Sequence, residues 1–145
     1  MKTIKIKQLK QTAIIPSKAH PNDAGFDLYA ANDIDIWIAP NSTVLIPTGW
    51  AMEIPQGYFG GIYARSGLAT KQGLRPCNCV GVIDSDYRGE IMVAIHNDSL
   101  ETQVISIGAK IAQLILHKID EFVMIPSNEL NNTERGTGGF GSSGN

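Results

Sequence analysis

The sequence predicts an all-β domain of short strands, arranged as a sandwich or barrel. Apolar and polar residues alternate with a period of two in many short segments. Gly, Pro, Asn and Asp residues interrupt these segments at nearly regular spacing, which is typical of antiparallel sandwiches and barrels. A chain of 145 residues forms one domain and buries roughly two-thirds of its unfolded surface, so it can build its own core.

The strand pattern recurs along most of the chain. It covers residues 3–7, 33–38, 43–47, 50–54, 58–63, 77–83, 90–96, 103–107 and 111–119. The sequence Pro47-Thr48-Gly49 separates the third of these segments from the fourth. One short helix is predicted at residues 66–72, and Gly73 is its expected stop.

Composition argues against several classes of protein. The formal net charge of −2 disfavours direct nucleic-acid binding, which requires a basic patch to neutralise phosphates. No stretch approaches the ~20 apolar residues that span a bilayer, so no membrane insertion is expected. Lys2, Lys5, Lys7 and Lys10 interrupt any apolar run at the N-terminus, and no signal peptide is predicted. We expect a soluble cytoplasmic protein, in the host cytoplasm if the gene is viral.

Two cysteines, Cys77 and Cys79, lie two positions apart. On a strand this spacing places both thiols on one face. A zinc site needs more ligands, and His20, His96 and His117 do not supply them at a metal-ligand spacing. We therefore expect two small, half-buried apolar side chains.

A carboxylate-rich segment follows the strand predicted at residues 77–83. Asp84, Ser85 and Asp86 are expected at a hairpin tip or a strand end, where carboxylates commonly form Asx turns. A general base beside a planar ligand uses the same arrangement, because the carboxylate must reach a water and the Tyr87 ring can wall off the ligand. The residues alone leave both interpretations open.

Residues 64–69, with the sequence Ala-Arg-Ser-Gly-Leu-Ala, lead into the predicted helix. Arg65, the Ser66 hydroxyl and the backbone of Gly67 make a credible anion site. A simple helix N-cap with an incidental arginine explains the same residues equally well.

The chain changes character at Ser127 and becomes polar, and then glycine-rich. Residues 135–144 combine Gly and Ser with one Arg and one Phe. Composition favours a disordered tail, whereas a glycine-rich backbone with Ser and Arg can also wrap phosphates. The segment lacks the Lys-Ser/Thr ending of the common nucleotide-triphosphate loop.

Five motifs in order resemble those of the trimeric dUTP diphosphatase (dUTPase) family. They lie at residues 23–28, 64–69, 81–90, 108–113 and 135–144. The resemblance implies a distorted jelly-roll or β-clip type barrel of short, mostly antiparallel strands, one short helix and a flexible C-terminal arm. It also implies a Mg²⁺-dependent homotrimer that converts dUTP and water to dUMP and pyrophosphate by in-line attack of water on the α-phosphorus. That activity limits uracil incorporation into DNA and supplies dUMP for thymidylate synthesis.

The resemblance assigns roles to residues around the third motif. Asp84 matches the carboxylate that activates the attacking water, and Tyr87 matches the ring that packs on the deoxyribose and leaves no room for a 2′-hydroxyl. The remaining matches read the uracil, through backbone groups or by lining its pocket: Asn78, Val82, Ile83 and Met92.

The other motifs match the phosphate, metal and arm positions. Asp27 matches the residue that holds Mg²⁺ through water. The phosphate-chain contacts match Arg65, Ser66, Gly67 and Gln113. The arm contacts match Arg135, Phe140, Gly141, Ser142 and Ser143. The resemblance therefore divides the chain into a β domain at residues 1–126 and a mobile arm at residues 127–145, which closes over a neighbouring active site.

Two rival interpretations are less consistent with these residues. A dCTP deaminase, which shares the fold, would need a glutamate general base beside the pyrimidine and a different Arg/Ser pattern in the second motif. A non-catalytic nucleotide sensor on this scaffold should have lost Asp84 or the arm residues, and all of them are present.

Overall fold

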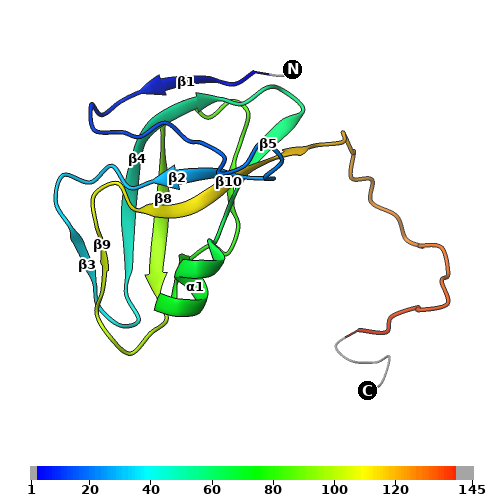
Figure 1. The fold of residues 1–145 in the computed structure, drawn as a ribbon. Coiled ribbons are helices and arrows are strands. Elements are labelled where there is room, and N and C mark those ends of the chain that lie inside the picture. Colours follow the sequence, from blue (N-terminus) through cyan, green and yellow to red (C-terminus); the bar gives the residue numbers. More distant parts are fainter. Residues whose placement is uncertain (1–2, 140–145) are drawn as a thin grey trace.

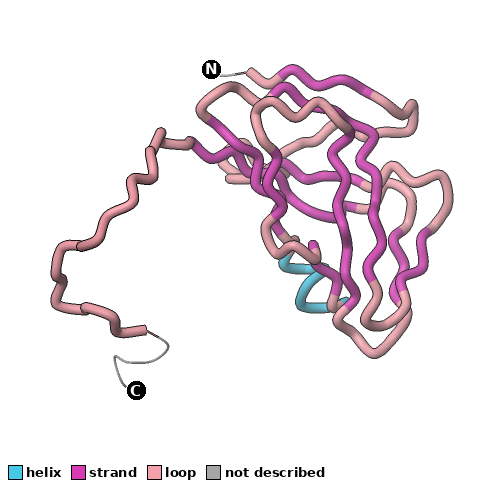
Figure 2. Tube along the Cα trace, turned by 180° about the vertical axis from the view of Figure 1, so that it is seen from behind, coloured by secondary structure: helices cyan, strands magenta, loops and turns pink. Residues whose placement is uncertain are grey.

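Three antiparallel sheets surround one apolar core in the computed structural model, which describes residues 3–139 (Figures 1 and 2). The first sheet has the order β1 (Lys5–Gln8), β4 (Thr43–Glu53), β8 (Glu90–Asn97) and β6 (Leu74–Pro76). The second has the order β2 (Phe26–Tyr29), β10 (Lys110–Lys118), β5 (Tyr58–Tyr63) and β7 (Gly81–Ile83). The third pairs β3 (Ile36–Ile38) with β9 (Gln103–Ile105), and a short helix, α1, spans Ser66–Gln72.

The strand pairings confirm the predicted fold class. Every pair of named strands between residues 3 and 139 is antiparallel, and α1 is the one helix in that part of the chain. The two four-stranded sheets with a small third sheet form a distorted jelly roll. No helix among the described residues is long and apolar enough to cross a membrane.

Alternation along β8 shows how the core forms. Ile91, Val93 and Ile95 are buried, whereas the Met92 side chain between them is exposed. All three sheets contribute fully enclosed side chains, among them Leu28, Ile38, Ile46, Leu74, Ile105, Ile111 and Leu114. Burial of apolar surface stabilises the fold by about 25 cal/mol per Å². The outward positions of the same strands are thereby free to carry a site.

Strand β4 is longer than the sequence suggested. We expected a break at residues 47–49, but β4 runs through them, so this expectation was wrong. The register of β4 against β8 shifts between Pro47 and Ala51, and Gly49 has φ 74°. The Thr48 hydroxyl, buried there, donates to the Ile91 carbonyl at 2.6 Å. Turn-forming residues here make a bulge within a strand, because pairing with β8 continues on both sides.

Two short strands were not predicted, and one predicted strand is partly a turn. β2 and β6 show no clear alternation in the sequence, because each is short and is bounded by glycine or proline. β5 and α1 occur at the expected residues, and Gly73 ends α1 in the left-handed region with φ 67°. The strand expected at residues 77–83 begins only at Gly81.

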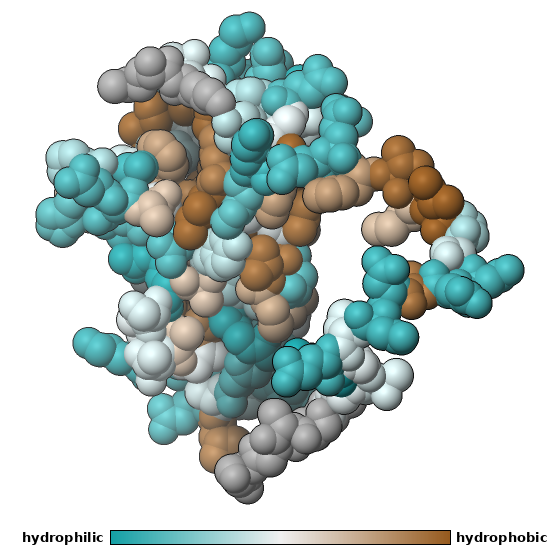
Figure 3. All heavy atoms as spheres, turned by 90° about the vertical axis from the view of Figure 1, so that its right-hand side faces the viewer, coloured by the Kyte–Doolittle hydropathy of each residue, from teal (hydrophilic) through white to brown (hydrophobic). Residues whose placement is uncertain are grey.

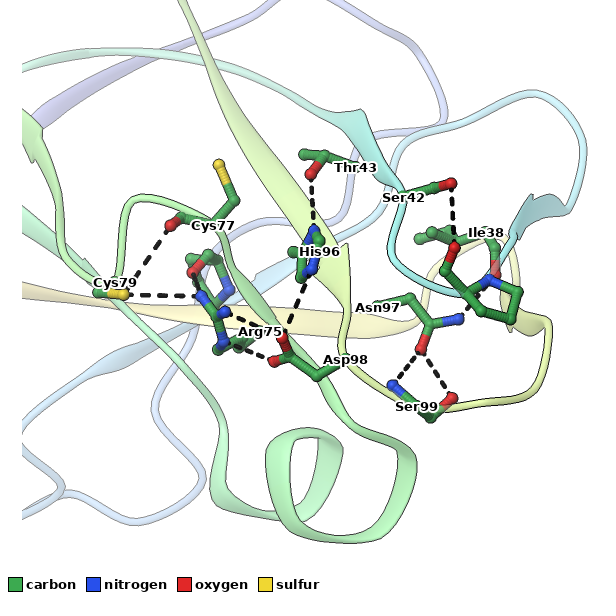
Figure 4. A network of polar contacts seen from close by, with 12 residues as sticks. Ile38, Ser42, Thr43, Arg75, Cys77, Cys79, His96, Asn97, Asp98 and Ser99 are labelled. Carbon is green, nitrogen blue, oxygen red and sulfur yellow. Dashed lines mark hydrogen bonds and ion pairs between the residues drawn. The ribbon is translucent and has the colours of Figure 1, made fainter.

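The cysteines lie in the turn before β7, not on a strand (Figure 4). Cys77 and Cys79 are both exposed, so the expectation of half-buried side chains was wrong. Cys79 has φ 60°, and Val80 N–H donates to the Asn78 carbonyl at 2.6 Å across it. A hydrogen bond over three residues with a positive central φ is a γ-turn, which gives the cysteines no strand-like common face.

Arg75 connects this turn to the end of β8. Its guanidinium makes a bidentate contact with Asp98 at 2.6 and 3.0 Å and reaches the Cys79 sulfur at 3.6 Å (Figure 4). The hydrogen bond from Arg75 lowers the pKa of Asp98 below its usual value. The turn is thus anchored from β6 to the loop after β8.

Beyond β10 the chain leaves the body of the domain (Figures 1 and 2). Residues 119–139 form no helix or strand. This segment carries four consecutive apolar residues that are 80–92% exposed: Phe122, Val123, Met124 and Ile125. They correspond to the brown group on the projecting part of the chain in Figure 3.

Candidate active site

Strand β10 brings together the first of two groups of predicted site residues. Gln113 pairs with Asp27 of β2 on one side and with Tyr63 of β5 on the other. Because β5 runs directly into the residues before α1, this register places Arg65, Ser66 and Gly67 beside Asp27 and Gln113. All five predicted phosphate and metal residues line one polar cleft of about 390 Å³.

Asp27 is the hub of this cleft, which we call the anion cleft. Its Oδ1 accepts from Arg65 Nε at 3.0 Å, and its Oδ2 lies 2.7 Å from Lys110 Nζ. The Asp27 side chain is 14% exposed, whereas those of Arg65 and Lys110 are 32% and 37% exposed. Hydrogen bonding to Asp27 raises the pKa of Lys110 above its usual value. One carboxylate therefore orients two cations at the edge of the cleft.

Lys110 received no role from the sequence, although it lies in the fourth motif. In β10 it pairs with Tyr29 of β2, and its ammonium lies 5.8 Å from the centroid of the Tyr29 ring. Its position in the same motif, three residues before Gln113, could have suggested a role in the same cleft. Two residues at that spacing in a strand point to opposite faces, however, and the register shift between Lys110 and Ala112 is what brings both toward Asp27.

The start of α1 bears on the two interpretations of residues 64–69. Arg65 occupies the N-cap position in extended geometry, with no side-chain capping bond, so Ser66 is not an N-cap. Ser66 and Gly67 are exposed, and no atom lies within 4 Å of the position a Gly67 Cβ would take. The Gln113 amide donates to the Ala64 carbonyl at 3.0 Å and ties β10 to this segment. The geometry favours an open anion site.

The second group of predicted residues lines a separate cavity of about 320 Å³. Its lining includes Val82 and Ile83 of β7, Asp84 and Tyr87 of the turn that follows, and Met92 of β8. β7 pairs with β5 and β8 pairs with β4, so Asp84 follows a strand end, not a hairpin tip. We call this cavity the Tyr87 pocket.

The turn that carries Asp84 is closed by its own backbone. Tyr87 N–H donates to the Asp84 carbonyl at 3.2 Å, and Arg88 Nη1 donates to the Ser85 and Tyr87 carbonyls at 2.7 and 3.0 Å. Within residues 3–139 the Asp84 carboxylate accepts no hydrogen bond and forms no ion pair, so it is not in an Asx turn. An exposed, unengaged carboxylate beside a pocket is suited to accept a proton from water.

The remaining predicted residues lie elsewhere. Asn78 is exposed in the turn before β7 and lines neither the anion cleft nor the Tyr87 pocket. Arg135 lies on the projecting segment, where its Nε donates to the Gly138 carbonyl at 2.9 Å. Phe140, Gly141, Ser142 and Ser143 lie outside the described residues. The anion cleft and the Tyr87 pocket share no lining residue, so the described part of the chain presents them as two separate clefts.

The anion cleft offers little for a metal held by protein alone. Among the described residues no three His, Cys, Asp or Glu side chains gather at a metal-binding distance. The Asp27 carboxylate already faces two cations but retains free lone pairs. Mg²⁺ keeps several waters and usually binds through one or two carboxylates and substrate phosphates. The residues therefore fit a metal that is bound with phosphates and contacts Asp27 through water.

Known proteins resemble this chain in sequence over almost its whole length. The family model described as dUTPase matches residues 11–144. The deoxyuridine 5′-triphosphate nucleotidohydrolase of Syntrophotalea carbinolica is 42% identical over 142 residues, which are 98% of this chain and 97% of that protein. The chain belongs to the dUTPase family.

Solved structures share its fold. The dUTPase of Staphylococcus bacteriophage 80alpha, solved with dUPNHPP, is 29% identical, with a TM-score of 0.86 and 99% of both chains covered. A mutant dUTPase from phage phi11 of S. aureus, solved with a structural Mg(II) ion, is 25% identical, with a TM-score of 0.82, covering 90% of this chain and all of that one.

The ion pair at Asp27 predicts an unusual lysine titration. In wild-type protein the Lys110 ammonium should titrate above the ordinary value of 10.5, and Asp27→Asn should return it toward that value. Because the folded pKa is raised, the pair stabilises the fold below the unfolded pKa of Lys110 and loses this effect as pH rises through the folded value. NMR of ¹³C-labelled lysine measures the titration directly.

A matched control is Asp33→Asn, which removes the carboxylate paired with Lys10. It should leave the Lys110 signal unchanged. A Lys110 signal that does not respond to Asp27→Asn would contradict the bridging role of Asp27.

Proposed function

We propose that this chain is a dUTP diphosphatase, which hydrolyses dUTP to dUMP and pyrophosphate. The observation that carries the proposal is the unengaged Asp84 carboxylate beside the Tyr87 pocket, in a chain of the dUTPase family. The relative from Syntrophotalea carbinolica is named for this activity. The same chain carries a polar cleft in which Arg65, the Ser66 hydroxyl and the Gln113 amide can contact a triphosphate.

Asp84 is the catalytic base of the proposed reaction. Its carboxylate accepts a proton from water as the water oxygen attacks the α-phosphorus in line. The bond from the α-phosphorus to the α,β-bridging oxygen breaks, and pyrophosphate leaves with the electron pair. The free carboxylate supports this role, because it has no competing partner among residues 3–139.

The Tyr87 pocket is assigned to the nucleoside. The Tyr87 ring packs on the deoxyribose, and Met92 also lines the pocket. Backbone groups of Val82 and Ile83, which line the pocket, read the uracil edge together with those of Asn78, which lies outside the pocket in the turn before β7. Backbone donors and acceptors in a narrow slot discriminate against cytosine, because its amino group would leave buried polar atoms unpaired.

The anion cleft is assigned to the phosphate chain. Arg65 supplies charge, Ser66 a hydroxyl donor, Gly67 open space for close approach and Gln113 an amide. Asp27 fixes the direction of the Arg65 guanidinium, so the charge is oriented before substrate arrives. Bound with the phosphates and reached by Asp27 through water, Mg²⁺ would neutralise charge that develops on the leaving pyrophosphate.

The proposed assembly is a homotrimer with shared active sites. Because the anion cleft and the Tyr87 pocket share no residue, a complete site is expected to combine parts of neighbouring copies. The exposed apolar segment at residues 122–125 also favours association, since contiguous apolar patches are rarely left in water.

The C-terminal arm at residues 127–145 is proposed to close over a neighbouring site. Arg135 and the hydroxyls of Ser142 and Ser143 would contact the terminal phosphate, with Gly141 allowing close approach and Phe140 stacking on the uracil. The two exposed, unpaired cysteines fit a reducing compartment, which supports a cytoplasmic location. There the activity would limit uracil in DNA and supply dUMP.

A substrate panel tests the activity. With Mg²⁺, the full chain should release pyrophosphate from dUTP far faster than from dTTP, dCTP or UTP, measured by a coupled pyrophosphate assay. Equal rates on dUTP and UTP would remove Tyr87 from sugar selection. Release of ammonia from dCTP would identify a deaminase instead.

Substitution of the proposed base tests the mechanism. Asp84→Asn should bind dUTP normally by calorimetry but turn it over at least ~100-fold more slowly, the usual size of a general-base contribution. Asp86→Asn, in the same turn, is the matched control and should remain near wild type. Comparable losses in both variants would mean that the turn, not the Asp84 proton acceptor, was disturbed.

Two truncations separate assembly from closure. A chain ending at Glu134 should fold and form trimers but lose most dUTP turnover, because it lacks arm contacts to substrate. A chain ending at Glu121 also lacks the exposed apolar segment and should fail to form trimers. Light scattering after size exclusion measures trimer formation, and pyrophosphate release measures turnover. Full turnover by the chain that ends at Glu134 would exclude the arm from the site.

A further inference from the structure

The Tyr87 ring is held in position by few contacts with the core. Its side chain is 45% exposed, so burial alone does not fix where the ring lies. Its hydroxyl donates to the Glu90 carbonyl at 3.2 Å, three residues further along the chain. The ring therefore folds back over its own turn, and the residues between 87 and 90 determine how closely it can do so.

Gly89 lies directly beneath the ring. A Cβ at Gly89 would overlap the Tyr87 hydroxyl oxygen and would lie 2.5 Å from Cζ and 3.0 Å from Cε2. Real Cβ atoms essentially never approach other heavy atoms so closely. The φ of Gly89 is outside the left-handed region, so an alanine would suit the backbone. A glycine is thus required at position 89 because any side chain there would occupy the space of the Tyr87 ring.

Glu90 connects the ring to the bulge in β4. Its carbonyl accepts from the Tyr87 hydroxyl, and its Oε1 accepts from the Gly49 N–H at 2.8 Å. Gly49 itself has φ 74°, and a Cβ there would lie 2.5 Å from the Ala13 Cβ. The acceptor for the Tyr87 hydroxyl is therefore anchored to a part of β4 that has little freedom to move.

We propose that Gly89 and Glu90 are positioning residues that set the place of the Tyr87 ring, and through it the selection for a 2′-deoxy sugar. This inference rests on the proposed function, because it assigns the ring to the deoxyribose. Steric exclusion of a 2′-hydroxyl oxygen requires the Tyr87 ring to be placed to within about an ångström. The close approach over Gly89 and the bond to Glu90 supply that accuracy to a half-exposed ring.

The test compares dUTP and UTP in the full chain with Mg²⁺. In Gly89→Ala the ring must swing away, so the ratio of kcat/KM for dUTP to that for UTP should fall at least ~10-fold, the scale expected for small misplacements. The thermal midpoint should change little, because the displaced ring moves toward solvent. Asp86→Asn, in the same turn, is the control: it adds no atom beside the ring, and the substrate ratio should stay at the wild-type value.

A double-mutant cycle separates positioning from a general structural role. In a Tyr87→Ala background, Gly89→Ala should not change the substrate ratio further, because no ring remains to be displaced. Additive effects, or an unchanged ratio in Gly89→Ala alone, would overturn the proposal. Glu90→Gln should keep the ratio, since it retains both oxygen acceptors, whereas Tyr87→Phe should lower it by removing the bond to the Glu90 carbonyl.

A readout that is independent of activity tests the position of the Tyr87 ring even if the proposed function is wrong. Met92 lines the Tyr87 pocket, so its ε-methyl NMR signal, assigned with Met92→Leu, reports the position of the ring. Gly89→Ala should shift this signal, and Asp86→Asn should not. A wild-type chain that cleaves neither nucleotide would reject the dUTP assignment and the sugar selection with it, while an unmoved Met92 signal would reject the positioning of Tyr87 by Gly89.

Discussion

The pairing of β10 with both β2 and β5 is the constraint from which the anion cleft follows. Gln113 stands opposite Asp27 on one side and Tyr63 on the other. Once this register forms, the chain leaving β5 must place Arg65 beside Asp27. A slip by one residue would turn these side chains to opposite faces and separate the charges. Core burial of Ala112 and Leu114, which flank Gln113 in β10, makes such a slip costly.

The charges in the cleft show how a weakly acidic chain can hold an anion. The net charge is −2, so no broad positive surface is available. Arg65 and Lys110 share the Asp27 carboxylate, and Asp23 also lines the cleft, so these four groups carry no net charge. Attraction for an anion therefore depends on how the cations are oriented, and not on a surplus of positive charge.

The Tyr87 pocket depends on a different kind of constraint. Its turn is closed by backbone hydrogen bonds and by Arg88, while Asp84 remains unengaged. The groups that hold the turn are thus distinct from the group that would react. This separation allows the turn to be rigid without neutralising the carboxylate, and it explains why residues with no chemistry of their own, such as Gly89, matter to the pocket.

Local sequence determined the position of β5, the alternation of buried and outward side chains in β8, the limits of α1 and the residue types of the five motifs, because these depend on side-chain periodicity and turn chemistry. The family resemblance added roles that periodicity could not supply. Tertiary structure alone decided that residues 47–49 lie inside β4, that Cys77 and Cys79 are exposed in a turn, and that Lys110 shares Asp27 with Arg65. In each case the outcome depends on a partner distant in sequence. Pairing with β8 continues β4 through residues 47–49, the cysteine turn connects β6 and β7 of different sheets, and pairing of β2 with β10 brings Asp27 to Lys110. Such pairings are fixed by burial of the whole core, which no local pattern contains.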